Sequence, residues 1–412
     1  MSEPDRRDFL RFSAGTAALA LASELLPTLE AAPRAEGLEV ALVGCGKQGR
    51  AILGELSKIE GLKVAALCDV FESRLASARR RAGELPCFKS HTELLAGAPG
   101  ATAWIVATPT HLHKEIVLAG LAAGKHVYCE APLAASLEDA RAIARAARGA
   151  KGVFQCGLLA RSNPVYLLAH SFAKSGALRD HVRARAQFHR KSSWRTSASN
   201  PEEERAHNWI LDPKLSLGLL GEAGTHAFDV AHWFWNAYPV AVRAGGSLQL
   251  YKDGRELPDT VLAELEFPEG RALSYSATLA SSFEGQHELF QGSMATIKLA
   301  QTAGWMFKEA DAPTQGWEVY ANRQQFHEEQ GITLIADATK LAKLGKLKEG
   351  VGLPNPPLYY ALADFVRSIL GEKPVATGAD EGLRAAAVAI RAHQALQTGQ
   401  RVEIRAEDLK SE

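Results

Sequence analysis

The chain has 412 residues, of which 46% are hydrophobic, and this length favours two folded domains. Lysine plus arginine and aspartate plus glutamate both number 47, so no excess of positive charge indicates a nucleic-acid partner. The five cysteines show no metal-ligand spacing, so the sequence predicts neither a metal site nor a disulfide framework.

Residues 1–35 have the pattern of an export segment. Arg6 and Arg7 precede Phe9 and Leu10, and an alanine-rich, mildly apolar run covers residues 12–22. A charged start followed by a short, weakly apolar stretch is typical of a twin-arginine signal. It predicts transport by the twin-arginine translocase and a periplasmic or other extracytoplasmic location. An ordinary amphipathic N-terminal helix is the alternative.

An apolar strand at residues 38–43 runs directly into the pattern Gly44-x-Gly46-x-x-Gly49. In a dinucleotide-binding turn these glycines allow, in order, the sharp turn, the approach of a pyrophosphate and the close packing of helix on strand. The following helix presents free N–H groups and a partial positive charge to the phosphates. The intervening residues, which belong to the same predicted cofactor turn, are Cys45, Lys47 and Gln48.

A second strand, residues 62–67, leads to Asp69, about twenty residues beyond the last glycine. An acid at this position accepts the ribose hydroxyls of NAD and repels the 2′-phosphate of NADP. The sequence therefore predicts NAD as cofactor, with NADP disfavoured, although the nearby Arg74 weakens that preference.

Strand and helix patterns alternate up to residue 157. Strands are expected at 101–107, 127–129 and 153–156, and helices are expected to begin near residues 92, 113 and 137. This alternation predicts a doubly wound parallel sheet, which makes residues 36–157 a Rossmann domain.

Longer segments with period-two alternation follow, at residues 182–189, 240–250, 260–267 and 272–280. They predict an open antiparallel or mixed sheet. Helices are expected at 358–370 and 382–398, before a terminal strand at 401–404, whereas 315–352 shows little apolar periodicity. The fold class is thus α/β, with residues 158–412 as a second α/β domain whose closing helices can pack back on the first.

Four segments, at 44–49, 107–113, 124–132 and 222–226, together resemble the glucose–fructose oxidoreductase/inositol dehydrogenase (Gfo/Idh/MocA) family. The resemblance covers nearly the whole mature chain. It implies a Rossmann domain and a C-terminal domain with a large open, mostly antiparallel sheet. One open sheet face would both cover the nicotinamide and support a homo-oligomer. Family members oxidise or reduce a sugar or polyol carbon with NAD(P).

The resemblance also implies roles for individual residues. His226 would exchange a proton with the substrate hydroxyl, a task that suits a neutral imidazole. Glu222 stands four residues earlier, where the family usually has Asp, and would face His226. His113 follows a strand end and would either act in the nicotinamide pocket or cap a helix. The predicted cofactor contacts from the matching segments are Thr108, Pro109, His113, Glu130 and Ala131.

Arg161 and Tyr166 follow the domain crossover and are candidate substrate contacts, with a structural role as the alternative for both. Asp229 and His232 share the expected helical face beyond His226. A carbohydrate site can also draw on aromatic and polar residues nearby, namely Trp194, His207, Asn208, Trp209 and Trp233.

The chain departs from the family at Ala131, because the family motif Glu-Lys-Pro has its lysine there. That lysine polarises the substrate hydroxyl, and losing one preorganised polar group commonly costs about a hundred-fold in rate. Possible replacements are Lys125, His113 and Lys191.

Three functions remain open. The first is an exported oxidoreductase that acts on a sugar or polyol with tightly held NAD, because NAD is not freely available outside the cytoplasm. The second is an NAD-dependent glycosidase or lyase without net redox, which oxidises C3, eliminates across C1–C2, adds water and re-reduces the sugar. The third is a non-catalytic relative that binds sugar or NAD.

Overall fold

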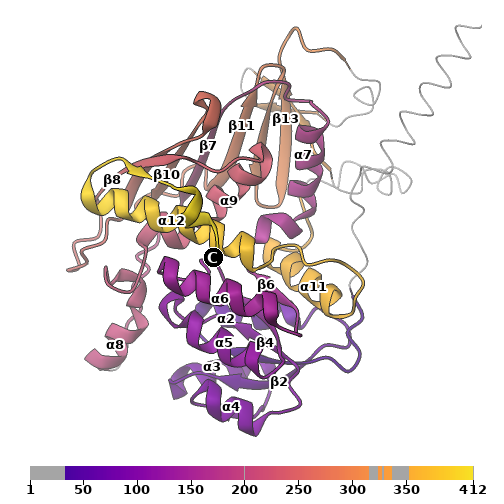
Figure 1. Ribbon diagram of the computed structural model, residues 1–412, viewed down its shortest axis with the longest axis vertical. Helices are drawn as coiled ribbons and strands as arrows, with labels where there is room; N and C mark the ends of the chain where they lie inside the picture. Colours follow the sequence, from indigo (N-terminus) through magenta and orange to yellow (C-terminus); the bar gives the residue numbers. More distant parts are fainter. Residues whose placement is uncertain (1–32, 199, 315–322, 327–328, 336–351, 412) are drawn as a thin grey trace, which may run out of the picture.

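The computed structural model describes residues 33–198, 200–314, 323–326, 329–335 and 352–411. The predicted export segment lies outside these residues up to position 32, and so does most of the 315–352 stretch. Two sheets organise the described chain, one in the lower and one in the upper half of Figure 1. None of the described helices is both long and apolar enough to cross a membrane.

The lower domain contains a six-stranded sheet in the order β3-β2-β1-β4-β5-β6, and every neighbouring pair is parallel. The strands are β1 (Glu39–Val43), β2 (Lys63–Cys68), β3 (Cys87–Phe88), β4 (Ala103–Val106), β5 (His126–Cys129) and β6 (Phe154–Cys156). The helices are α2 (Lys47–Leu56), α3 (Glu72–Ala82), α4 (His91–Gly97), α5 (His113–Ala122) and α6 (Leu137–Gly149). This confirms the predicted doubly wound sheet.

Two elements of this domain, α3 and β3, are not revealed by the sequence pattern. Helix α3 buries only Leu75 and Ala78 and ends in three consecutive arginines, so its apolar stripe is narrow. Strand β3 has two residues, too few to show any alternation.

The glycine turn fixes how β1 joins α2. Gly44 has a φ of +98°, and a Cβ there would lie 2.5 Å from the carbonyl oxygen of Ala107, just past β4. A Cβ on Gly49 would lie 1.9 Å from the carbonyl oxygen of Gly44. A Cβ on Gly46, in contrast, would approach only the Nη1 of Arg74, at 3.9 Å. Packing therefore requires the first and third glycines, whereas the second faces open space.

The upper domain is built on a ten-stranded sheet in the order β14-β15-β13-β12-β11-β7-β10-β9-β8-β16. The pairing of β7 with β10 is parallel and the other pairings are antiparallel, so the sheet is mostly antiparallel, as the resemblance implies. Its strands are β7 (His181–His189), β8 (Ala241–Ser247), β9 (Thr260–Glu266), β10 (Ala272–Thr278), β11 (Gln286–Gly292), β12 (Ala295–Ala300), β13 (Ala303–Lys308), β14 (Arg323–Phe326), β15 (Glu329–Thr333) and β16 (Val402–Glu403).

The four period-two segments of the sequence correspond to β7, β8, β9 and β10. Strands β11, β12, β13, β14 and β15 are additional to that prediction. In β11 the adjacent polar residues His287 and Glu288 are both buried, which interrupts the apolar alternation. A strand that buries polar groups does not show the usual pattern of a half-buried strand.

Helices cover one face of the ten-stranded sheet (Figure 1). They are α7 (Pro164–Lys174), α9 (Gly224–Trp235) and α12 (Ala379–Thr398). On the sheet side, Ala184 and Phe290 share a hydrophobic core with Leu168 of α7 and Val230 of α9. This packing leaves the opposite sheet face without a covering helix among the described residues.

The last two helices contact the Rossmann domain. In α11 (Pro357–Ile369), Leu362 and Phe365 share a core with Leu42 of β1. In α12, Leu383 belongs to a core of the Rossmann domain, whereas Ala392, nine positions later, belongs to the core of the upper domain. One helix therefore packs into both cores and holds the two domains together.

The ten-stranded sheet has two different faces, one covered by helices and one open. This corrects the expectation that a single open face both covers the nicotinamide and supports oligomers. Phe188 and Glu288 lie on the helix-covered face with Ala184 and Phe290, because side chains alternate along a strand. Arg185 and the 65%-exposed Leu262 line a hollow on the opposite face.

The glycine geometry makes a paired prediction. Gly49→Ala places a methyl group against a backbone carbonyl, so we expect a loss of about 1–3 kcal/mol in the free energy of unfolding. Gly46→Ala meets no protein backbone, so we expect a loss below about 1 kcal/mol, together with at least ten-fold weaker NAD binding. Thermal unfolding of the apo variants and titration with NAD measure the two effects. Equal stability of the two variants, or full NAD affinity in Gly46→Ala, would contradict the packing argument.

Candidate active site

A cavity of about 730 Å³ lies between the two domains. It opens beyond the carboxyl ends of the parallel strands, where the strand order reverses between β1 and β4. The predicted residues that line it are Gly46, Lys47, Gln48, Thr108, Pro109, His113, Glu130, Ala131, Tyr166, Glu222 and His226. The structure thus gathers most of the sequence-predicted site around one space.

The Rossmann wall of the cavity fits a dinucleotide. The start of α2 has no side-chain cap, so its first N–H groups are free to bind phosphate oxygens. Gly46 faces the space where those oxygens would lie. Gly44, Cys45 and Gly49 lie behind this surface and support the turn.

Asp69 stands at the end of β2, as predicted, and is 7% exposed. Its Oδ2 accepts the backbone N–H of Cys45 at 2.8 Å, and its Oδ1 accepts the N–H of Phe71 at 2.9 Å. The Nη1 of Arg74 lies 4.0 Å from the same carboxylate, with the guanidinium over the Phe71 ring. Asp69 therefore joins the glycine turn to β2; it does not itself line the cavity, whereas the neighbouring Arg74 does.

His113 does not have a free catalytic nitrogen, which corrects its prediction as a catalytic residue. Its Nδ1 lies 3.1 Å from the carbonyl oxygen of Pro132 and 3.2 Å from that of Leu133, and its Nε2 lies 3.0 Å from that of Thr108. The side chain is 1% exposed and burial lowers its pKa. His113 therefore connects the loops that follow β4 and β5. For the same reason it cannot replace the missing lysine.

Glu130 and Ala131 follow β5 on the cavity wall. Burial raises the pKa of Glu130 to about 7, although Gln48 donates a hydrogen bond to its Oε1 at 2.9 Å. Ala131 is joined to Pro132 by a cis peptide bond and presents only a methyl group. The cavity therefore has a carboxyl that gains or loses its proton near neutral pH, and an apolar surface where the family motif has a cation.

Glu222 makes its hydrogen bonds away from His226, contrary to the expected pairing. Its carboxyl accepts from Thr110 Oγ1 at 3.0 Å, from Ser216 Oγ at 3.3 Å and from the backbone N–H of Leu217 at 3.3 Å. Burial raises its pKa to about 7. No hydrogen bond joins it to His226 within the described chain. Three donors already satisfy the carboxyl: Thr110 from the Rossmann domain, and Ser216 and Leu217 from the upper domain.

His226 lies in the first turn of α9, directly after a π-helical turn at Leu219–Ala223, and lines the cavity. Burial lowers the pKa of His226, while the nearby Asp229 carboxylate acts in the opposite direction. The imidazole is therefore neutral at pH 7 and able to accept a proton. Asp229, rather than Glu222, is the acid that stabilises its charged form.

Arg161 binds Asp229 and does not line the cavity, which corrects its prediction as a substrate contact. Its Nε and Nη2 donate to the two carboxylate oxygens of Asp229 at 3.0 and 2.7 Å. The guanidinium also lies 5.7 Å from the centre of the Trp233 ring. This two-bond pairing fixes the Asp229 carboxylate, which stands three residues after His226 in α9. The sequence gives no direct signal for it, because the partners are 68 positions apart.

Tyr166 lines the cavity and donates a hydrogen bond of 2.5 Å to Oε2 of Glu288. Glu288 also lines the cavity, is 3% exposed, and has its pKa raised to about 7 by burial. Sequence reasoning missed Glu288 because it missed strand β11. A charged residue inside a buried strand was the available signal.

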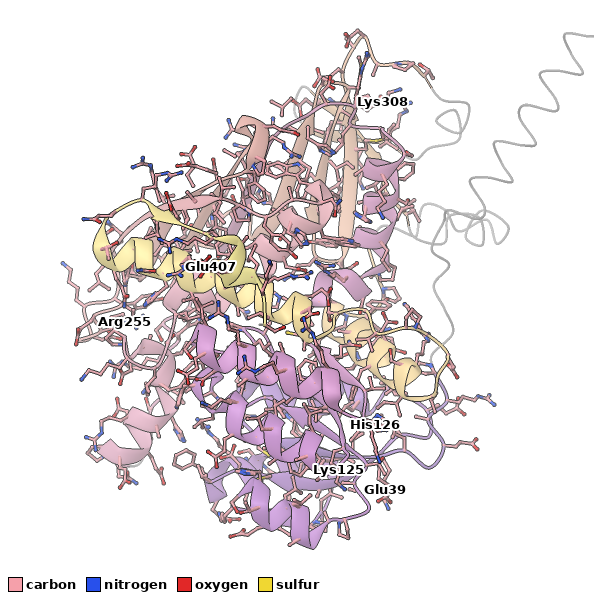
Figure 2. All side chains as sticks on the ribbon, in the orientation of Figure 1. Glu39, Lys125, His126, Arg255, Lys308 and Glu407 are labelled. Carbon is pink, nitrogen blue, oxygen red and sulfur yellow. The ribbon has the colours of Figure 1, made fainter. Side chains whose placement is uncertain are left out.

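Neither lysine proposed as a replacement reaches the cavity. Lys125 precedes β5, at the opposite end of the strand from Glu130, and its Nζ donates to the carbonyl oxygen of Pro99 at 2.8 Å. Figure 2 shows it beside Glu39 and His126 at the lower end of the molecule. Lys191 is exposed and does not line the cavity.

A segment of the upper domain, residues 194–198 and 200–211, extends over the Rossmann domain, and we call it the strap. It contains α8 (Pro201–His207), which lies beside the lower domain in Figure 1. His207 packs edge-on against Phe71 with ring centres 4.7 Å apart, and Trp209 lies 5.8 Å from His111. Trp194, His207 and Trp209 line the cavity, whereas Trp233 does not.

Polar bonds anchor the strap to the upper domain. Arg195 donates to Asp253 Oδ2 at 2.9 Å, and the buried Arg255, labelled in Figure 2, also binds Asp253. Within the strap, Arg195 also donates to Glu204 Oε1 at 2.9 Å. Asn208 bonds to both backbone groups of Thr196 and is structural. These bonds therefore hold the strap to the upper domain beside the cavity.

Two family models match the chain. Residues 38–158 match the NAD-binding Rossmann fold of the Gfo/Idh/MocA oxidoreductase family, and residues 188–404 match the C-terminal alpha/beta domain of that family. Together they include both walls of the cavity.

Individual relatives agree with these matches. Inositol 2-dehydrogenase 1 of Saccharopolyspora erythraea is 26% identical over 304 residues, covering 73% of this chain and 84% of the relative. The 1,5-anhydro-D-fructose reductase of Ensifer adhaerens is 29% identical over 316 residues, covering 76% and 82%.

Among solved structures, a levoglucosan dehydrogenase in complex with NADH and levoglucosan superposes with a TM-score of 0.69 at 21% identity. The match covers 89% of this chain and 99% of that chain, and it shows a shared fold. With both family models matched in order and the expected cofactor turn in place, the chain belongs to the Gfo/Idh/MocA family of NAD-binding oxidoreductases.

Proposed function

We propose that this protein is an exported NAD-dependent oxidoreductase that converts a hydroxyl of a sugar or polyol into a ketone, and the reverse, with His226 as acid/base. The observation that carries the proposal is the position of His226, a neutral imidazole on the same cavity as the glycine turn. Relatives named for inositol and for 1,5-anhydro-D-fructose support a polyhydroxylated substrate.

The cofactor would be held by the Rossmann wall. The free N–H groups of α2 would bind the pyrophosphate, and Asp69 would face the ribose hydroxyls. When bound, NAD supplies the hydride acceptor. Thr108 and Glu130, on the loops after β4 and β5, would border the nicotinamide.

Proton transfer is the task of this chain's own residues. Neutral His226 accepts the proton of the substrate hydroxyl as the C–H bond breaks and the carbonyl forms. Asp229 stabilises the resulting imidazolium, and the Arg161 pairing keeps Asp229 in place. In the reverse direction the imidazolium returns the proton to the oxygen of the carbonyl.

The export part of the proposal is supported by the twin-arginine pattern of residues 5–22. The translocase carries folded proteins, so the cofactor can be bound before export to the periplasm. The strap, which crosses from the upper domain to Phe71 and His111, supports slow cofactor release. We also propose a homo-oligomer through the uncovered sheet face, where Leu262 is exposed.

A redox-neutral glycosidase or lyase is the second candidate. Three buried carboxyls on one cavity, those of Glu130, Glu222 and Glu288, have pKa values raised by burial to about 7. Elimination and hydration need several groups that both donate and accept protons near neutral pH, whereas hydride transfer needs one.

The test begins with mass spectrometry of the small molecule released when the purified, folded protein is denatured. The holoprotein is then incubated, without added cofactor, with myo-inositol, 1,5-anhydro-D-glucitol and levoglucosan, and separately with aryl glycosides. Stoichiometric NAD that becomes reduced by a polyol supports the oxidoreductase. Release of the aryl group without net NADH formation would establish the glycosidase instead.

His226→Ala should lower the rate constant of polyol oxidation by about 10²–10⁴ at pH 7, because it removes the proton acceptor. In the wild type a decline in rate should occur at acidic pH, as His226 becomes protonated and can no longer accept a proton. Burial lowers the pKa of His226, so this decline should lie below the usual histidine range. Single-turnover rates against pH measure both effects, with the bound NAD content as control. A variant that keeps the same acidic decline would exclude His226 as the base.

The strap prediction concerns cofactor release. His207→Ala and Trp209→Ala each remove one aromatic contact to the Rossmann domain, and such contacts contribute about 0.5–1.5 kcal/mol. We therefore expect each to raise the dissociation rate of NADH by about two- to ten-fold, as measured by fluorescence during exchange with excess NAD. Glu202→Ala, an exposed position in α8, is the matched control and should change nothing. Unchanged release in both aromatic variants would show that the strap does not retain the cofactor.

A further inference from the structure

We infer that Tyr166 and Glu288 form a hydroxyl-binding subsite for a second hydroxyl of the substrate, and so restrict the enzyme to uncharged polyhydroxylated compounds. This inference rests on the proposed function and specifies which substrates that function takes. It assigns a role to a pair of residues from α7 and β11 that the glycine turn and His226 do not involve.

The pair lies on the wall opposite the expected cofactor. Tyr166 and Glu288 belong to the upper domain, whereas the glycine turn and Asp69 belong to the Rossmann domain. Phe188, on the same sheet face as Glu288, lines the cavity beside them. A carboxyl on this wall repels phosphates, so it suits the substrate rather than the dinucleotide.

Glu288 has unused capacity to accept hydrogen bonds. Its Oε2 receives the Tyr166 hydroxyl, whereas its Oε1 has no hydrogen-bond partner within the described residues. By comparison, three donors satisfy Glu222. A carboxylate accepts up to about four hydrogen bonds, and a buried one is costly unless they are supplied. A substrate hydroxyl entering from the cavity would supply one.

The pair can act as acceptor or donor for that hydroxyl. With Glu288 ionised, its free oxygen accepts, whereas the phenol oxygen of Tyr166 already accepts the backbone N–H of Gln301. With the proton on Glu288, the Tyr166 O–H is released to donate to a substrate oxygen. A hydroxyl both donates and accepts, so it matches this pair, whereas a carboxylate or phosphate on the substrate would meet a like charge.

This subsite also bears on the missing lysine at position 131. An enzyme without that cation needs another means to hold the substrate ring in position relative to His226. A second hydrogen-bonded hydroxyl provides it. Sites that hydrogen-bond a substrate hydroxyl discriminate strongly against analogues without it, because the buried protein groups are then left unpaired. The consequence is a preference for polyols over simple alcohols.

The test combines protein variants with deoxy substrates, using NAD-loaded protein and the polyol from the panel above that has the lowest KM. Tyr166→Phe and Glu288→Gln should each raise KM by about 10- to 100-fold with unchanged NAD content. With the wild type, one monodeoxy analogue of that polyol should show a similar rise in KM. For that analogue, Tyr166→Phe should raise KM little further, because the analogue already lacks the hydrogen bond that the variant removes. Calorimetric titration of the NADH-loaded protein with the polyol checks that KM reports binding.

Tyr275→Phe is the matched control. Tyr275, on β10, has its pKa raised by burial and, to a smaller extent, by the nearby Glu288 carboxyl, but it does not line the cavity between the domains. A wild type that oxidises polyols while Tyr166→Phe and Glu288→Gln behave like Tyr275→Phe would overturn the subsite alone. The subsite would also be overturned if the effects of the variant and of the deoxy analogue on KM were additive for every analogue. Such additivity would indicate that the two residues have a merely structural role. A wild type that oxidises no polyol would instead refute the proposed function, and the subsite with it.

Discussion

The active-site cavity depends on the packing of α12 into both domain cores. Leu383 contacts the Rossmann core, and Ala392, further along the same helix, lies in the core of the upper domain. At the crossover, the Thr377 hydroxyl donates to the carbonyl oxygen of Cys156 at 2.5 Å, and the N–H of Cys156 donates back to the Thr377 carbonyl at 2.9 Å. Because a helix is stiff over this length, the distance between the two cavity walls is set by packing rather than by a flexible linker.

That fixed separation explains the electrostatic character of the site. Three glutamates are withdrawn from water on the cavity walls, and burial brings the pKa of each to about 7. Each has a different set of partners: Gln48 for Glu130, three donors for Glu222 and Tyr166 alone for Glu288. A family member with lysine at position 131 would place a positive charge next to these groups. With Ala131, the cavity is instead rich in groups that gain or lose a proton near neutral pH.

Two further features connect residues that are distant in sequence near the cavity. Arg161 and Asp229 form a two-bond ion pair, and the Asp229 carboxylate favours the charged form of His226, one helical turn earlier in α9. The strap connects the upper domain to Phe71 and His111 of the Rossmann domain. The ion pair joins two elements of the upper domain, whereas the strap joins the upper domain to the Rossmann domain.

The sequence by itself determined the features that local geometry controls. A positive φ at Gly44 and the close contact at Gly49 admit only glycine, so the cofactor turn is visible as a pattern. The alternation of strands and helices predicted the parallel sheet, and Asp69 was expected where β2 ends. His226 was expected on the cavity through the family resemblance, where the structure places it.

Only the tertiary structure decided which groups share the cavity. The pairs Tyr166–Glu288 and Arg161–Asp229 are 122 and 68 positions apart, and no periodicity links such partners. Tertiary packing also placed the His113 ring nitrogens against three backbone carbonyl oxygens and the Glu222 carboxyl beside Thr110, because burial makes each polar side chain take the partners within reach.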